Sequence, residues 1–242
     1  MSTAVQTALR LVYPPRCLLC QVLVDRDFGL CGACWRETPV ISGLVCDLCG
    51  VPLPGDDDAL EVHCDTCLKT ARPWSKGRAA LLYKDNARRL VLGLKHGDRH
   101  DVAHLVHSWM VRCAAELIIP STLIVPVPLH WSRLLKRKYN QSALMAQSIA
   151  ETYKCAYCPD VLVRGRKTQV LDGLGFEERF RTLDNVIFPH SKKGSALKGA
   201  KVVLIDDVMT SGATLSACAQ ACLSAGADEI FVLVLARAAA AN

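Results

Sequence analysis

The segment Val202-Val-Leu-Ile-Asp-Asp-Val-Met-Thr-Ser-Gly-Ala-Thr214 decides the fold of the larger part of the chain. Its apolar start predicts a buried strand, and Asp206 and Asp207 stand at the tip of that strand as acceptors for hydroxyl groups. The following turn opens a helix, whose positive end and backbone N–H groups suit a phosphate. Glycine at 212 lets the backbone approach closely. We therefore expect a phosphate-binding loop made of Thr210, Ser211, Gly212, Ala213 and Thr214.

Helix and strand patterns alternate on both sides of this segment. The apolar spacing predicts strands over 79–83, 122–127, 161–163, 202–205 and 230–235, and helices over 86–94, 102–118, 142–153 and 213–225. Such alternation is typical of an α/β domain with a largely parallel sheet. Ligands of these sheets sit outside the carboxyl ends of the strands, so the tip at Asp206 is the place to look for chemistry.

The cysteines divide the chain into two parts. Eight of the thirteen fall within the first 67 residues, as four consecutive Cys-x-x-Cys pairs. Each pair places two sulfurs on one side of a tight turn, and two pairs supply the four thiolates of a structural zinc ion. We predict two structural zinc ions, with the ligands Cys17, Cys20, Cys31, Cys34, Cys46, Cys49, Cys64 and Cys67.

Spacing alone does not fix which pairs share an ion. Pairing in chain order gives one site from the first two pairs and one from the last two, whereas interleaved pairing uses the same eight residues. Chain order is favoured because its loops close most easily. A four-thiolate site leaves no open position for catalysis, so the metal's expected role is to hold together a module too small to build its own core. The other five cysteines need no special function.

Charge follows the same division. Residues 1–72 hold six Lys/Arg against nine Asp/Glu, and residues 73–242 hold twenty-three against fourteen. We place a zinc-binding module at 1–72 and the α/β domain at 77–242. The sequence has no run near the roughly 18 apolar residues that span a bilayer, and its start lacks the pattern of a signal peptide. We therefore expect a cytoplasmic protein without membrane insertion. In that reducing compartment, clustered cysteines are expected to bind metal rather than form disulfides.

The segment 202–214 resembles the PRPP-binding loop of type I phosphoribosyltransferases. Further segments resemble the ComF (GntX-like) family: Pro126-Val-Pro-Leu129, Arg137-Lys-Tyr-Asn-Gln-Ser142, Leu94-Lys-His-Gly-Asp98, Pro15-Arg-Cys17 and Leu235-Ala-Arg237. The chain is identified by this resemblance as a ComF-type protein, a double zinc ribbon followed by a type I phosphoribosyltransferase-like domain. The resemblance implies a role in handling single-stranded DNA during natural transformation, with a competence helicase or a membrane channel as a candidate partner.

The resemblance also implies roles for site residues. Asp206 and Asp207 would hold the ribose hydroxyls of PRPP, residues 210–214 the 5′-phosphate, and Arg133, Lys136 and Arg137 the diphosphate, with Mg²⁺ required if the domain is catalytic. Residues 164–175 would close as a lid. No residue that recognises an acceptor is evident. Two functions therefore stay open: a binder of PRPP or a nucleotide-like phosphate and of single-stranded DNA, and an active phosphoribosyltransferase of unknown acceptor.

Two features near the basic segment 133–138 bear on these alternatives. Trp131 and Tyr139 flank it, and aromatic rings beside a cationic groove suit stacking with single-stranded DNA. The alternative is that Trp131 packs against the protein and the lysines form a solvated face. Lys138 replaces the glycine of the family's Arg-Gly-Phe-Asn-Gln pattern. If that position needs a positive φ, the lysine costs on the order of 1 kcal/mol of strain.

Overall fold

The computed structural model describes residues 13–56, 60–96, 99–166 and 175–239. A five-stranded parallel sheet forms its centre, in the order β1-β7-β6-β2-β3. Its strands are β1 (Lys76–Leu82), β7 (Glu229–Arg237), β6 (Lys201–Met209), β2 (Leu123–Pro126) and β3 (Ala156–Tyr157). The predicted parallel α/β fold is confirmed, and β6 extends past the predicted strand to include both aspartates.

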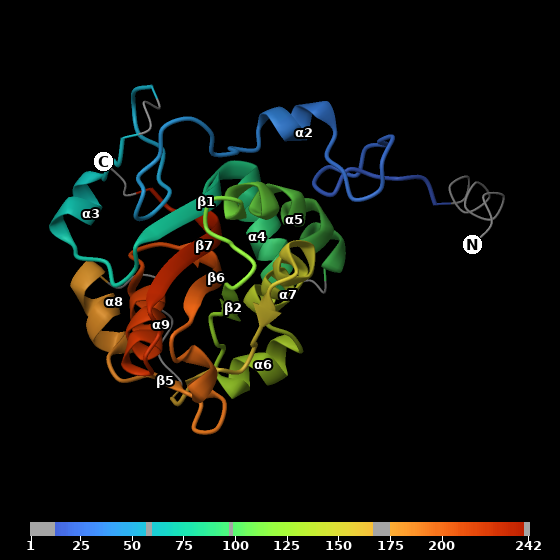
Figure 1. Ribbon diagram of the computed structural model, residues 1–242. Helices are drawn as coiled ribbons and strands as arrows, with labels where there is room; N and C mark the ends of the chain where they lie inside the picture. Colours follow the sequence, from blue (N-terminus) through green and yellow to red (C-terminus); the bar gives the residue numbers. More distant parts are fainter. Residues whose placement is uncertain (1–12, 57–59, 97–98, 167–174, 240–242) are drawn as a thin grey trace.

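Helices cover both faces of the sheet (Figure 1). On one face lie α4 (Asp85–His96), α5 (His100–Ala114) and α7 (Gln141–Tyr153). On the other lie α8 (Phe176–Leu183) and α9 (Ala213–Ser224). Alternate residues of β6 enter the two cores, because strand side chains alternate between faces: Val203 packs with α4, α5 and α7, and Val202 with α9. Burial on both faces explains the continuous apolar runs in the sequence.

Shorter elements complete the larger domain. The helix α6 (Trp131–Arg137) follows β2, and the 3-10 helix η1 (Gly194–Leu197) precedes β6. The strands β4 (Leu162–Arg164) and β5 (Ile187–Pro189) form a separate antiparallel pair. The strand predicted over 161–163 therefore exists but lies outside the main sheet. The sequence pattern did not predict α6, which carries no fully buried residue, nor the short strands β3 and β5.

The cysteine-rich region runs along one side of the sheet and contains the short helices α2 (Gly32–Arg36) and α3 (Asp65–Lys69). Figure 1 shows α2 beside α5, and α3 on the opposite side near α8. Between them, residues 39–41 lie along the edge strand β1: Ile41 N–H donates to Ala80 O at 3.0 Å, and Leu82 N–H donates to Pro39 O at 2.9 Å. The connecting segment thus covers an open sheet edge.

Candidate functional site

Asp206 and Asp207 lie at the carboxyl end of β6, where the sequence places them. The Asp206 carboxylate accepts hydrogen bonds from Ser142 Oγ at 3.0 Å and from the Asp207 N–H at 2.9 Å. Asp207 forms an ion pair with Lys95 Nζ at 3.2 Å. Burial, and then the charge of Asp207, raise the pKa of Asp206 to about 7. Two adjacent acids in a partly dry site do not ionise together readily, and a ligand that donates hydrogen bonds would stabilise the charged pair.

The phosphate loop, residues 210–214, turns from β6 into α9 as the sequence predicts. Gly212 has φ 85 and caps α9, a left-handed conformation that favours glycine. Ser211 Oγ accepts the Ala213 N–H at 3.3 Å, which holds the start of the helix. Thr210 and Thr214 line the cavity described below, while Ser211, Gly212 and Ala213 are buried beneath it. These three residues therefore offer a ligand their backbone groups rather than their side chains.

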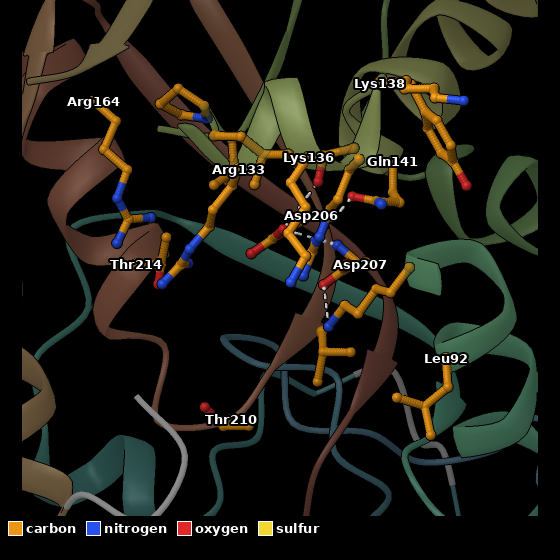
Figure 2. A pocket seen from close by; sticks show the side chains of 18 of the residues that line it. Leu92, Arg133, Lys136, Lys138, Gln141, Arg164, Asp206, Asp207, Thr210 and Thr214 are labelled. Atoms are coloured by element: carbon orange, nitrogen blue, oxygen red, sulfur yellow. Dashed lines mark hydrogen bonds and ion pairs between the residues drawn. The ribbon is translucent and has the colours of Figure 1, made fainter. Parts of the chain in front are cut away.

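A cavity of about 840 Å³ opens beside the two aspartates, and we call it the basic cavity. In Figure 2, Arg133 and Arg164 extend toward Thr214, and Lys136 extends toward Asp206. Burial lowers the pKa of both Arg133 and Arg164, and the charge of a neighbouring arginine lowers each further. An anion between these guanidinium groups would relieve both effects. The charged residues that line the cavity are Lys95, Arg133, Lys136, Arg137, Lys138, Arg164, Asp206 and Asp207.

The segment around α6 differs in detail from what the sequence predicts. Lys138 has φ 65 and forms the left-handed C-cap of α6, so the position does need a positive φ. Its side chain lies apart from Asp206 and Thr214 (Figure 2). Tyr139 is half-buried, and its hydroxyl donates to Leu94 O at 2.6 Å. Trp131 is 66% exposed, which contradicts the alternative that it packs against the protein. Trp131 is therefore the more exposed of the two rings, while Tyr139 lines the basic cavity.

Arg164 belongs to β4 and is buried, which contradicts the expectation that it moves with a lid. Residues 167–174, the greater part of that predicted lid, lie outside the described residues. The sequence also left several members of this site without a role. Lys95 and Ser142 stand in segments quoted for the family resemblance, yet nothing in their spacing indicated contacts to Asp207 and Asp206. Helix packing brings Lys95 and Ser142 next to the two aspartates. They are far from the aspartates in the sequence, so no local pattern predicts these contacts.

The eight paired cysteines form two clusters in chain order, which is the grouping that loop closure favours. We call Cys17, Cys20, Cys31 and Cys34 the first cysteine site, and Cys46, Cys49, Cys64 and Cys67 the second cysteine site. Sulfurs about 2.3 Å from a tetrahedral zinc ion lie about 3.8 Å from one another. The distance from Cys20 Sγ to Cys31 Sγ is 3.6 Å, and that from Cys49 Sγ to Cys64 Sγ is 3.7 Å. These edges fit a zinc tetrahedron and are far longer than a disulfide bond.

The second cysteine site lies close to two arginines. The pKa of Cys49 is lowered by hydrogen bonds with Cys46 and Cys67 and also by the Arg237 guanidinium. Hydrogen bonds with Cys46 and Cys49 raise the pKa of Cys67, and Arg72 acts in the opposite direction. Thiolates bound to a metal are therefore accompanied by positive charge at this site.

Family models match both parts of the chain. A model described as a double zinc ribbon domain matches residues 8–68, and one described as a phosphoribosyl transferase domain matches residues 123–242. Together with the two four-cysteine clusters, the first match supports structural zinc. The fold and the cavity thus define a phosphoribosyltransferase-type domain preceded by a double zinc ribbon. The matches leave out residues 69–122, so the boundary between 72 and 77 stays a prediction.

Curated relatives resemble the chain over nearly its whole length. "DNA utilization protein YhgH" of Salmonella typhimurium is 30% identical over 94% of this chain and 99% of the relative. "Competence protein F" of Haemophilus influenzae is 29% identical over 92% of this chain and 97% of the relative. "Competence protein ComFC" of Bacillus subtilis is 23% identical over 84% and 82%. The chain belongs to the ComF family.

Solved structures resemble the larger domain only in part. The glutamine PRPP amidotransferase of Bacillus subtilis, complexed with ADP and GMP, is 18% identical over 60% of this chain, with a TM-score of 0.40. The chain spans 30% of that enzyme's length. The assignment of the fold rests on the sheet order and the family models. Within the described residues, no helix has both the length and the apolar surface needed to cross a bilayer.

Proposed function

We propose that the chain binds PRPP or a nucleotide-like phosphate in the basic cavity and handles single-stranded DNA during DNA uptake. The proposal rests on one observation: acidic and phosphate-binding groups border the same basic cavity. Paired carboxylates suited to ribose hydroxyls face the cavity at Asp206 and Asp207, while the phosphate loop and the Arg133 and Arg164 guanidinium groups border it. A ribose 5-phosphate carries both kinds of group, hydroxyls that donate hydrogen bonds to carboxylates and a phosphate that accepts them.

The printed names of the relatives supply the biological setting of the proposal. They describe competence proteins and DNA utilization proteins, and the chain covers nearly all of their length. Single-stranded DNA would follow the positively charged face beside α6, where Trp131 offers a ring for stacking. All thirteen cysteines lie within the described residues and none forms a disulfide, which suits the reducing cytoplasm that we propose as the location.

A pair of binding measurements tests the proposal. We expect saturable binding of PRPP by calorimetry and of a fluorescent single-stranded oligonucleotide by anisotropy. Asp206→Asn with Asp207→Asn should weaken PRPP binding at least about tenfold, because hydrogen bonds to charged groups contribute about 1.5–3 kcal/mol each. The same change should leave DNA affinity intact or raise it. The control Glu177→Gln with Glu178→Gln removes two exposed charges outside the cavity and should change neither affinity.

The DNA arm has its own variant. Arg133→Gln with Lys136→Gln should lower DNA affinity and reduce its dependence on salt, since fewer phosphates would be neutralised. A protein that binds PRPP but shows no affinity for DNA at moderate salt would remove the DNA part of the proposal. A protein that binds neither would remove the proposal as a whole.

The size of the cavity favours a second candidate function, an active phosphoribosyltransferase. At about 840 Å³ it lies in the upper part of the usual range of about 300–1,000 Å³ for small-molecule sites. Asp206 and Asp207 offer the hard carboxylate oxygens that Mg²⁺ prefers, and Mg²⁺ commonly binds through such groups together with ligand phosphates. When bound, the ion would neutralise charge on the diphosphate. Release of diphosphate from PRPP with Mg²⁺ and a panel of bases and amines would support this function.

A further inference from the structure

Two arginines connect the phosphate loop with the second cysteine site. Arg72 Nη1 donates to Ser211 O at 2.7 Å. Arg237 Nη1 donates to Thr210 O at 2.7 Å and to Met209 O at 3.2 Å. Arg237 is 4% exposed, and Arg72 lies over the Trp74 ring with its guanidinium carbon 5.4 Å from the ring centre. We call Arg72 and Arg237 the arginine bridge.

The arginine bridge determines which way the loop's N–H groups face. In a planar trans peptide the C=O and the next N–H point in opposite directions. The two arginines hold the carbonyls of residues 210 and 211 on the side of the cysteine site, and Arg237 adds to the Ala238 N–H that already fixes the carbonyl of residue 209. The N–H groups of Thr210, Ser211 and Gly212 are thereby turned to the opposite side. Consecutive N–H groups that face one way are the usual means of binding a phosphate.

The other side of the arginine bridge meets the metal-binding thiols. Arg72 Nε and Nη2 and Arg237 Nε are buried and have no hydrogen-bond partner among the described residues. Trp74, which Arg72 covers, and Met209, whose carbonyl Arg237 holds, pack in one buried cluster with the cysteines of the second site. Four thiolates around one Zn²⁺ carry a net charge of −2, which two guanidinium groups balance. Buried charges need such partners, so a filled second site would hold the arginine bridge in place.

Packing leaves this arrangement little freedom. A Cβ atom on Gly212 would lie 2.7 Å from Arg72 Nη1, so the loop rests directly on the guanidinium group. Trp74, beneath Arg72, donates from Nε1 to Leu48 O at 2.6 Å, inside the second cysteine site. The first cysteine site has different anchors: Arg89 donates to Leu19 O and Arg99 to Leu18 O. Among the described contacts, none joins the first site to the phosphate loop.

We infer that Arg72 and Arg237 are positioning residues that couple zinc binding at the second cysteine site to phosphate binding at the loop. The inference rests on the proposed function, since it assumes a phosphate ligand at residues 210–214. Coupling between two sites is reciprocal. Zinc in the second site should tighten phosphate binding, and a bound phosphate should tighten zinc binding by the same factor. We expect the more stable zinc-bound state to release its ion more slowly.

The unaltered full-length protein provides the first test. Zinc release to a chromogenic chelator is followed with and without saturating ribose 5-phosphate, whose binding is measured separately by calorimetry. We expect the ligand to slow release of one ion about tenfold, within the usual range of coupling, and to leave the other unchanged. A Cys20→Ser chain, which keeps only the second site intact, identifies the affected ion. Release of both ions at unchanged rates, with the ligand bound, would overturn the inference.

Substitutions provide the second test. Arg72→Gln and Arg237→Gln should each weaken ribose 5-phosphate binding about tenfold and reduce the effect of ligand on zinc release to less than about twofold. Arg237→Lys, which keeps the charge, should restore part of the coupling. The control Arg89→Gln removes a matched contact from an arginine to a carbonyl at the first site and should change neither quantity. Full coupling in both bridge variants would also overturn the inference.

The two proposals fail in different ways. No binding of ribose 5-phosphate or PRPP by the unaltered protein would overturn the proposed function, and the inference with it. Binding without an effect on zinc release would overturn the inference alone. If a bridge variant does not fold, the measurement on the unaltered protein still decides the question.

Discussion

The two cysteine sites use the same four ligands but are embedded differently. In the first site Cys17 and Cys34 are buried, Cys20 is exposed and Cys31 half-buried, and the surrounding residues meet the domain through Leu18 and through ring contacts such as Phe28 with His104. In the second site Cys46, Cys49 and Cys67 are buried in the same apolar core as β6 and α9. The first site holds a peripheral module together. The second site belongs to the core of the domain, so equal ligand sets do not imply equal roles.

The largest expected effect comes from removing one ligand of each site. Cys64→Ser should destabilise the protein by about 4 kcal/mol or more at neutral pH, because structural zinc contributes of order 10 kcal/mol and its loss here opens the core. Cys20→Ser should cost about 1 kcal/mol of global stability, since the loosened part lies at the periphery. Thermal unfolding measures both, and elemental analysis should find one zinc ion in each variant. Equal losses of stability would refute the contrast between the two sites.

A smaller effect compares two glycines with the same backbone conformation. Gly50, beside Cys49, has φ 68, and a Cβ there would lie 2.6 Å from Ala79 N. Gly43, on the connecting segment after the first site, has φ 75 and open space around it. Gly43→Ala should cost about 1 kcal/mol, the strain of the left-handed conformation alone. Gly50→Ala should cost about 3 kcal/mol, because backbone contact adds to that strain.

Denaturant unfolding of the two variants gives the difference directly. Both glycines have a similar φ, so the strain of that conformation cancels when the two losses of stability are subtracted. The remaining difference measures how closely Gly50, beside Cys49, packs against β1. A difference below about 0.5 kcal/mol would mean that Gly50 does not pack closely against β1.

The smallest expected effect concerns the basic cavity and not the cysteine sites. The raised pKa of Asp206, about 7, means that the folded state binds a proton that the unfolded state has already released. The stabilising contribution is present in full below the ordinary pKa near 3.8 and is lost as the pH rises through 7. From pH 6 to pH 8 the loss amounts to about 1 kcal/mol.

Asp206→Asn should remove this slope from the stability profile, and zinc stays bound throughout the interval. The check is the difference between the unfolding free energies of the two proteins at pH 6, 7 and 8. A parallel pair of profiles would show that Asp206 does not titrate in this interval.

Local patterns predicted much of the fold and of the site. The strand, the acid pair and the loop of 202–214 are contiguous, so one segment contains both the geometry and its chemistry. The Cys-x-x-Cys pairs are likewise local. The replacement of the family's glycine by Lys138 left open whether the position needs a positive φ, and the structure shows that it does.

What the sequence could not provide are contacts between distant residues. Arg72 and Ser211 lie 139 positions apart, and Lys95 reaches Asp207 on β6 from the helix α4. Neither contact produces a periodic pattern in the sequence, because both depend on how whole helices and strands pack together. The placement of β4 with β5 instead of in the main sheet was missed for the same reason: three apolar residues predict a strand but not its neighbour.

The segment 39–41 along β1 has a consequence for the life of the protein in the cell. It lies between the two cysteine sites, so the order of those sites sets how firmly it stays on the sheet edge. A newly made chain that finds no zinc would leave β1 exposed to strand pairing with another copy. Zinc starvation would thus act on this protein first through aggregation and proteolysis, and the amount of intact protein would follow the supply of metal.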